Sequence, residues 1–278
     1  MEAMLAQRKR IRNPVGAGMF YPEDSKEMLE FIRAFNLEAG RGGQAQAIIA
    51  PHGAWGFSGA LVANAFSAAM GRSGSINRVV VLGPIHDKRE KGIFLSNSHS
   101  FHTPLGNIPV DQETTEELEQ NGRYFEINDI PHLGEHSIEI LLPFVKYCFP
   151  HASIVPILMG QPNSHHISDL AHSLKTVITP VLYETLLVVS CNLSCDNDKA
   201  TARQWAEECL RLFSKKDAPA LASAILDGRI NPCGGGLVVS LLESGLLDGK
   251  RPYSASDSLT SAVGLENNTV FYSAVSFE

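Results

Sequence analysis

The chain has 278 residues, of which 44% are hydrophobic and 19% are charged, so it can bury a large core and lacks the composition of a disordered protein. Its 23 Lys and Arg residues against 30 Asp and Glu give a formal net charge of -7, which argues against nucleic acid and anionic membranes as partners. No stretch approaches the roughly 18 consecutive apolar residues of a membrane span.

The chain contains no tract with the composition of a linker, so we expect one domain over residues 1–278. The first 18 residues lack the apolar core of a signal peptide, and we therefore expect a cytoplasmic protein. The five cysteines make an odd number in a long chain, which argues against a disulfide framework and leaves reduced thiols for chemistry.

Short apolar runs bounded by turn residues recur along the chain and are typical of buried strands. They start at residues 47, 78, 92, 153, 185 and 269, with the sequences AIIA, RVVVLGP, GIFLS, SIVPILM, TLLVVS and TVFYSAVSF. Helical patterns lie between most of them, at residues 60–70, 112–120, 138–149, 167–177, 200–213 and 237–247. Strands that alternate with helices predict an α/β fold with a mostly parallel central sheet flanked by helices.

Polar residues follow several of these strands. His52 comes after the first strand, His86 after the second, and Asn192 and Cys195 after the fifth. Ligands of such sheets bind beyond the carboxyl ends of the strands. One histidine there is usually structural, but two histidines and a thiol-bearing loop at strand ends favour a functional site.

Two further clusters leave alternatives open. In GEHSIEI, the residues Glu135, His136 and Glu139 surround a helix start, either as pocket residues or as an acidic first turn that complements the helix dipole. In NPCGGG, Cys233 precedes three glycines, either as a small buried residue or as a reactive or metal-binding thiolate. We interpret four other histidines as surface residues: His151, His165, His166 and His172.

Motifs in the same order along almost the whole chain resemble those of the Memo family, which includes protein B of the AmmeMemoRadiSam system. They are VGAGMFYP, APHGAWGFSG, VVVLGPIHD, FHTPLGNIPVDQE, EHSIEILLPF, VPILMG and NPCGGG. This family is similar in fold to the class III extradiol dioxygenases, non-haem iron enzymes that open catechol rings. A shared fold does not by itself transfer that reaction.

The resemblance implies a mononuclear metal site made of His52, His86 and Cys233, with His136 as a proton carrier in the same pocket. Two imidazoles and a thiolate differ from the face of two histidines and one carboxylate that suits iron(II) oxygenases. The softer sulfur ligand favours copper(I) or zinc over iron, and we expect one of these three metal ions as cofactor.

The sequence departs from the family at SCNLSCD, where family members usually carry S-x-D-x-S-H. Asn192 replaces an Asp and Cys195 replaces a His, and an Asn amide cannot take a proton. The chain therefore either uses another proton path or has lost the ancestral reaction, and Cys195 is also a candidate further ligand of the metal.

The function that we expect is metal-dependent oxidoreductase chemistry on a small molecule, with His136, Asn192 and Cys195 as the candidate catalytic residues. We do not expect efficient extradiol cleavage of simple catechols. The alternative is a non-catalytic protein that binds a metal or a peptide in the same cleft. A cysteine hydrolase built on Cys233 ranks last, because no general base is identifiable. The sequence leaves the substrate and the oligomeric state open.

Overall fold

The computed structural model describes residues 10–37, 43–254, 260–263 and 268–278. The first nine residues, which are half of the segment considered for a signal peptide, lie outside these ranges. Eight strands form the main sheet. Their order is β11 (Pro252–Ser254), β14 (Val275–Phe277), β2 (Ala47–Ala50), β9 (Thr185–Ser190), β3 (Arg78–Pro84), β8 (Ser153–Met159), β4 (Ile93–Leu95) and β7 (Phe125–Ile127).

The four central strands β2, β9, β3 and β8 are parallel, as the alternation of strands and helices predicts. Ala50 pairs with Ser190, so β2 and β9 end level with each other, and β3 runs beside β9 in the same direction. The loops after these strands therefore leave the sheet at one edge. Among the outer strands, β14 is antiparallel to β2 and β4 is antiparallel to β8, so the sheet is mixed at its sides.

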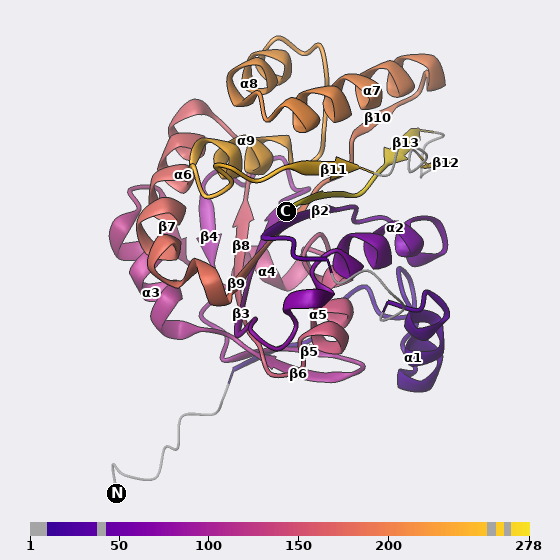
Figure 1. Cartoon of the computed structure of the whole chain (residues 1–278), viewed down its shortest axis with the longest axis vertical. Coiled ribbons are helices and arrows are strands. Elements are labelled where there is room, and N and C mark those ends of the chain that lie inside the picture. Colours follow the sequence, from indigo (N-terminus) through magenta and orange to yellow (C-terminus); the bar gives the residue numbers. More distant parts are fainter. Residues whose placement is uncertain (1–9, 38–42, 255–259, 264–267) are drawn as a thin grey trace, which may run out of the picture.

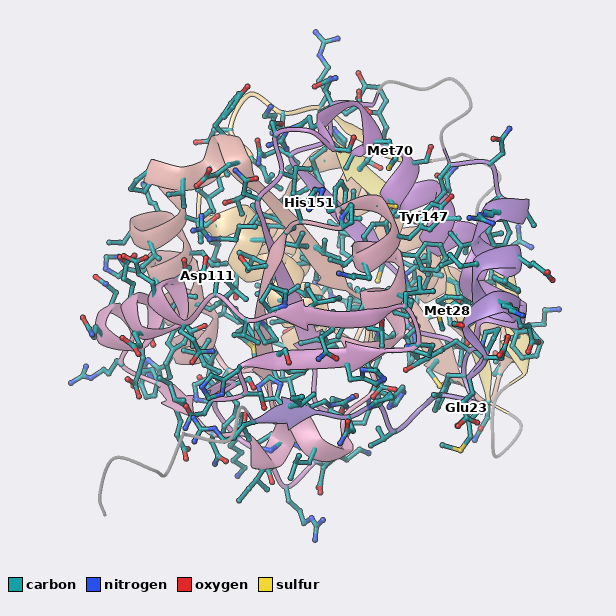
Figure 2. The ribbon with its side chains drawn as sticks, turned by 90° about the horizontal axis from the view of Figure 1, so that it is seen from below. Glu23, Met28, Met70, Asp111, Tyr147 and His151 are labelled. Atoms are coloured by element: carbon teal, nitrogen blue, oxygen red, sulfur yellow. The ribbon has the colours of Figure 1, made fainter. Side chains whose placement is uncertain are left out.

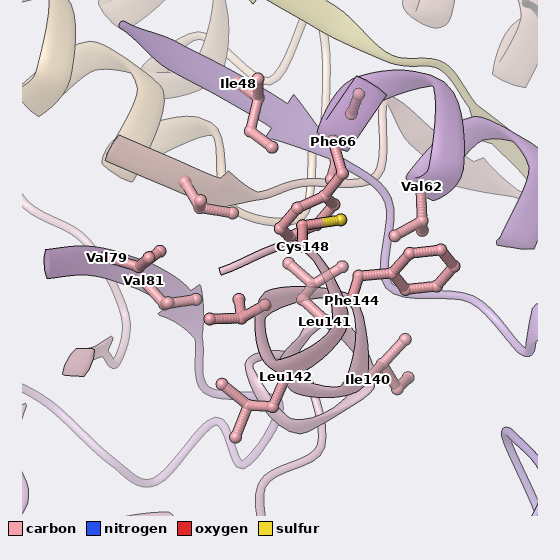
Figure 3. Packing of buried hydrophobic residues seen from close by; sticks show 14 of the residues in the cluster. Ile48, Val62, Phe66, Val79, Val81, Ile140, Leu141, Leu142, Phe144 and Cys148 are labelled. Atoms are coloured by element: carbon pink, nitrogen blue, oxygen red, sulfur yellow. The ribbon is translucent and has the colours of Figure 1, made fainter. Parts of the chain in front are cut away.

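Helices cover both faces of this sheet, as Figure 1 shows. One face carries α1 (Ser25–Ala34), α2 (Trp55–Ser67) and α5 (Leu142–Cys148), and the other carries α3 (Gln112–Asn121), α6 (Ser164–Ile178), α7 (Lys199–Lys215), α8 (Ala218–Leu226) and α9 (Gly235–Glu243). Each face has its own apolar core. On the first face, Val79 and Val81 of β3 pack with Phe66 of α2 and Phe144 of α5 (Figure 3).

Two small sheets complete the fold. One consists of β1 (Ile11–Arg12), β5 (Ser100–Thr103) and β6 (Gly106–Pro109), and the other of β10 (Ser194–Asp196), β13 (Thr269–Tyr272) and β12 (Thr260–Val263). The remaining elements are α4 (Ile130–Gly134) and the short 3-10 helices η1 (Met70–Arg72), η2 (Glu139–Leu141) and η3 (Thr179–Glu184). No helix within the described ranges is both long and apolar enough to cross a membrane.

Several predicted elements have different bounds in the structure. The run at residue 269 is two strands rather than one, because the chain passes from the small sheet to the main sheet at Ser273 and Ala274. The helix predicted at 138–149 starts as η2, and α5 follows with Pro143 in its first turn, a position where its missing N–H costs nothing. The sequence prediction also missed α1 and α8.

Side-chain caps mark most of the well-predicted helix starts. Asp111, labelled in Figure 2, accepts a hydrogen bond from the backbone N–H of Thr114 at the start of α3. Asn163 caps α6 in the same way through the N–H of His166. The cap leaves His166 buried against the ring of Tyr124, so the prediction that His166 is a surface residue was wrong.

Candidate metal centre

His52 follows β2 at the carboxyl edge of the sheet and is only 2% exposed. Its Nδ1 lies 2.8 Å from the hydroxyl of Ser190, which in turn donates to the carbonyl of Ser137 at 2.7 Å. A hydroxyl has one proton, so Ser190 accepts from His52, and Nδ1 carries the hydrogen. Burial, reinforced by the charges of His86 and His136, holds the pKa of His52 well below its usual value.

The other ring nitrogen of His52, Nε2, therefore carries a lone pair. It is a buried atom with no hydrogen-bond partner among the described residues. Nitrogen atoms of His52 and His86 and the sulfur of Cys233 lie within 4.8 Å of one another, and Sγ of Cys233 is 3.4 Å from Nε2 of His86. Ligands of a tetrahedral metal ion lie roughly 3.3–3.6 Å apart at ordinary bond lengths. The three donors fit such an ion with only small movements.

His86 follows β3 and is held by the carboxylate of Glu135. Glu135 accepts from the backbone N–H of His86 at 2.7 Å, from its Nδ1 at 3.0 Å, and from the backbone N–H groups of His136 and Ser137. Carboxylates commonly orient metal-binding histidines in this way. Burial opposes ionisation of Glu135, but the hydrogen bond and charge of His86 outweigh it and lower the pKa of Glu135 to about 2.

The same contacts act on His86. Burial lowers the pKa of His86, but hydrogen bonds and charges from Cys233 and Glu135 outweigh it and raise the pKa to about 10. A metal ion would therefore displace a proton from Nε2 when it binds, which makes its affinity dependent on pH.

Cys233 reaches the site from the loop before α9. The backbone N–H of Asn192 donates to the carbonyl of Cys233 at 3.0 Å and fixes this loop beside the end of β9. The next residue, Gly234, has φ of +100°, and a side chain there would place its Cβ 2.4 Å from the carbonyl oxygen of Ser190. A glycine is thus required for the chain to turn from Cys233 into α9.

His136 lies over the outer part of the site. Its ring stacks on His86 at 4.6 Å between centroids and, on its other face, on Phe20 at 4.6 Å. Its Nδ1 is 3.3 Å from Glu135. Burial lowers the pKa of His136 despite the nearby carboxylate, so the ring is mainly neutral at pH 7. His136 therefore lies beside His86 and Glu135.

Ligand atoms of His86, Glu135 and His136 also lie within 4.8 Å of one another. The oxygens of Glu135, however, already accept three backbone N–H groups as well as Nδ1 of His86. Glu135 is thus an anchor for two histidines, and the cluster of His52, His86 and Cys233 is the better candidate for a metal.

Asn192 and Cys195, which we expected to depart from the family pattern, have different surroundings. Asn192 accepts the backbone N–H of His52 through its side-chain oxygen at 3.0 Å, so it ties the His52 loop to the Cys233 loop. Cys195 is half-buried in β10, opposite Val270. Burial, followed by the nearby Cys233 and Asp196, raises the pKa of Cys195. Within the described part of the chain, Cys195 belongs to neither group of potential metal ligands.

The motif VGAGMFYP forms an anchor beneath the site. Glu139 was predicted either as a pocket residue or as part of an acidic first turn. It forms a buried ion pair with Arg12. It also accepts hydrogen bonds from the hydroxyl of Tyr21 at 2.6 Å and from the backbone N–H of Gly16 at 2.7 Å. Arg12 also donates to the carbonyl of Glu135 at 2.7 Å. These contacts hold Phe20 over His136.

Sequence reasoning missed the support of the two histidines. Ser190 and Ser137 form the hydrogen-bonded chain behind His52, and Glu135 was noted without its role toward His86. The available signal was that Ser190 is the last residue of the strand sequence TLLVVS. Ser190 pairs with Ala50, which lies two residues before His52. Nothing local pointed to Arg12.

The chain is similar to one described protein family and to several known proteins. The profile of the family described as "Memo-like protein" matches residues 12–263. A MEMO1 family protein of Thermotoga neapolitana is 31% identical over 84% of this chain and 88% of its own length, and one of Methanobrevibacter smithii is 27% identical over 86% and 89%. An uncharacterized protein from Escherichia coli K12, known as a crystal structure, aligns at 12% identity over 84% of this chain and 99% of its own, with a TM-score of 0.47.

The family match spans both histidines, Cys233, Glu135 and the anchor around Glu139. By the extent of this match and by the identity to the Thermotoga protein, the chain belongs to the Memo-like family.

Proposed function

We propose that this protein binds one metal ion, which is zinc, copper or iron, through His52, His86 and Cys233. The protein would use this ion for oxidoreductase chemistry on a small molecule. The observation that carries the proposal is Nε2 of His52. Among the described residues this buried nitrogen has no hydrogen-bond partner, Ser190 fixes the tautomer of its ring, and it belongs to a group of three potential ligands whose donor atoms lie within 4.8 Å of one another. A buried polar atom without a partner is costly unless a ligand satisfies it.

Three protein ligands leave a fourth position open for a small molecule. When bound, such an ion supplies Lewis acidity or electron transfer there. The surrounding residues would orient and protonate the molecule. Glu135 holds the His86 ring, neutral His136 accepts or returns a proton, and Phe20 shields His136 from water on one face. A reducing compartment keeps an unloaded Cys233 as a thiol ready for metal binding, which supports a cytoplasmic location.

The test is elemental analysis of protein purified without oxygen and with reduced thiols, followed by titration of the metal-free protein with Co²⁺. We expect about one metal ion per chain and a sulfur-to-cobalt charge-transfer band. His52→Ala should weaken binding and Cys233→Ser should abolish the band. Stoichiometric Co²⁺ binding with no band in the parent protein would contradict the assignment of Cys233.

The second candidate is a non-catalytic protein that binds a metal or a peptide in this cleft. Asn192 supports it, because its side-chain oxygen is occupied by the backbone of His52 and its amide cannot exchange protons. An Asp oxygen could accept the same bond, so the double variant Asn192→Asp and Cys195→His should fold normally. Redox turnover of small molecules by the metal-loaded parent favours the first candidate. Turnover gained only in the double variant favours the second.

Under the first candidate, simple catechols should still be poor substrates. The thiolate replaces the carboxylate ligand of the extradiol enzymes, and Cys195 replaces the histidine of the family pattern. Oxygen uptake with a ring-opened product at about 1 per second or faster would contradict this expectation.

A further inference from the structure

A second feature of the site is a cavity of about 230 Å³ that adjoins Cys233. It lies between the ends of β3 and β8, the end of α8 and the start of α9. Its walls are mostly apolar and are formed by Pro84, Ile85, Met159, Pro162, Ile225, Pro232 and Leu237. At roughly 30 Å³ for each water-sized group, the space holds a benzene ring with one small substituent.

Lys88, an exposed residue, is the one Lys or Arg in the lining of this cavity, and no carboxylate lines it within the described residues. Gln161, Asn231 and Cys233 supply its other polar side chains. No ion pair of Lys88 is present in that part of the chain either. The amino end of α9, with Gly234 as its cap and no capping side chain, forms another wall, and the helix dipole is positive there.

Other cavities near the site have the opposite character. The cavity along Phe20 and Trp55 is lined by three carboxylates, from Glu23, Asp24 and Glu27. The cavity beside His86 and His136 contains Asp87, Glu90 and Glu135 along with Arg89. The carboxylates of the first cavity would repel an organic anion. In the second cavity the anion would meet charges of both signs.

We propose that the cavity beside Cys233, called here the Lys88 cavity, binds a small organic carboxylate whose apolar body fills the walls and whose charge faces Lys88 and the start of α9. Such a molecule would lie against the sulfur of Cys233 and reach the open position of the metal. Its role as substrate rests on the metal centre proposed above, whereas its binding to the cavity does not.

The experiment uses benzoate and benzyl alcohol, which share a ring and differ in charge, on metal-free reduced protein by isothermal titration. We expect saturable binding of benzoate and weaker binding of the alcohol. Lys88→Met should weaken benzoate binding about three- to fivefold, as expected for a partly exposed charge, and leave the alcohol unchanged. The surface variant Lys175→Met serves as the matched control. Ile225→Phe, which fills the cavity, should weaken both probes.

Equal affinity for the two probes, or no saturable binding of benzoate, would overturn the proposal whatever the metal content. Full benzoate binding in folded Ile225→Phe would place the site elsewhere. The link to the metal is tested separately, by adding benzoate to the Co²⁺-loaded protein. A changed cobalt spectrum supports the substrate role. An unchanged spectrum with intact binding to the metal-free protein would overturn that role alone.

Discussion

Glu135 and Glu139 lie four residues apart in EHSIE and are both buried, yet they serve different parts of the molecule. Glu139 turns toward Arg12 and the motif VGAGMFYP, which it fastens to the body of the protein. Glu135 turns toward His86 and the backbone around His136.

The difference lies in the partner. A guanidinium is a permanent cation in proteins, so we treat the pair of Arg12 with Glu139 as a structural contact. His86 can lose a proton, so its pair with Glu135 can switch between holding a protonated ring and orienting a metal ligand. Substitutions on the two sides should therefore affect different quantities, stability around Glu139 and metal affinity around Glu135.

The largest effect should come from Glu139→Gln. It leaves the Arg12 charge buried without its counter-ion, and breaking such a pair from one side costs about 3–5 kcal/mol. Urea unfolding of the metal-free protein measures the loss. The control is Glu207→Gln in the exposed pair with Arg203, which should cost at most about 1 kcal/mol. A loss for Glu139→Gln no larger than the control would break the comparison.

The next effect is a pH dependence on the Arg12 side. The carbonyl of His132 accepts from Arg12, and burial lowers the pKa of His132 to about 4 from an ordinary value of 6.5. Between these pH values His132 binds more protons in the unfolded chain than in the folded protein. The contribution of neutral His132 to the free energy of unfolding is therefore complete above about pH 6.5 and is lost as the pH falls toward about 4. We expect up to about 3 kcal/mol from this source.

The variant His132→Gln can still donate to the carbonyl of Phe94 but does not titrate. Its unfolding free energy should fall less steeply than that of the parent over this pH range. If the unfolding free energies of the two proteins fall equally steeply with pH, His132 is not the source of the pH dependence.

On the other side of the comparison, Glu135→Gln should weaken Zn²⁺ or Co²⁺ binding roughly 10- to 100-fold, as the loss of a carboxylate behind a metal-binding histidine usually does. The amide keeps an oxygen for the backbone donors but loses the charge that orients His86. Competition with a chromophoric chelator measures the affinity. The matched control is Glu139→Gln, assayed under conditions in which it is folded. Equal losses of metal affinity in the two variants would show that Glu135 has no special role toward the metal ligands.

The smallest effect should come from Ser190→Ala, which removes a neutral hydrogen bond behind His52 worth about 0.5–1.5 kcal/mol. Metal affinity should fall by less than about tenfold, because the ring keeps its place but loses the partner that selects its tautomer. The control is Ser173→Ala, which should not change metal affinity; Ser173 is a buried serine of α6 whose hydroxyl has no hydrogen-bond partner among the described residues. A larger loss for Ser190→Ala than for Glu135→Gln would reverse the order of the two supports.

Much of the fold could be predicted from local patterns. The strands at residues 78, 153 and 185 match β3, β8 and β9, and the α/β class with a central sheet is confirmed. The prediction was poorest where tertiary contacts override periodicity. The run at 269 divides because its two halves pair with different sheets, and α2 starts earlier than expected because Ala54 offers no capping side chain as a signal.

The site divides in the same way. The position of His52 and His86 after buried strands marked them from the sequence alone, since the carboxyl ends of parallel strands share one edge. Cys233 was identified as a candidate metal ligand from the resemblance to the family and not from its spacing in the sequence. Its place beside His86 depends on the turn at Gly234 and on the bond from Asn192, which no local pattern reveals.

The sequence by itself determined where the central strands and several of the covering helices lie and which side chains stand at the ends of those strands, because apolar periodicity and capping act between near neighbours. The tertiary structure decided how these ends combine. Strand order and register bring Ser190 behind His52, and the fold of the EHSIE stretch sends Glu135 to His86 and Glu139 to Arg12. Those pairings join residues far apart in the chain, so only the packing of the whole sheet and its two cores selects them.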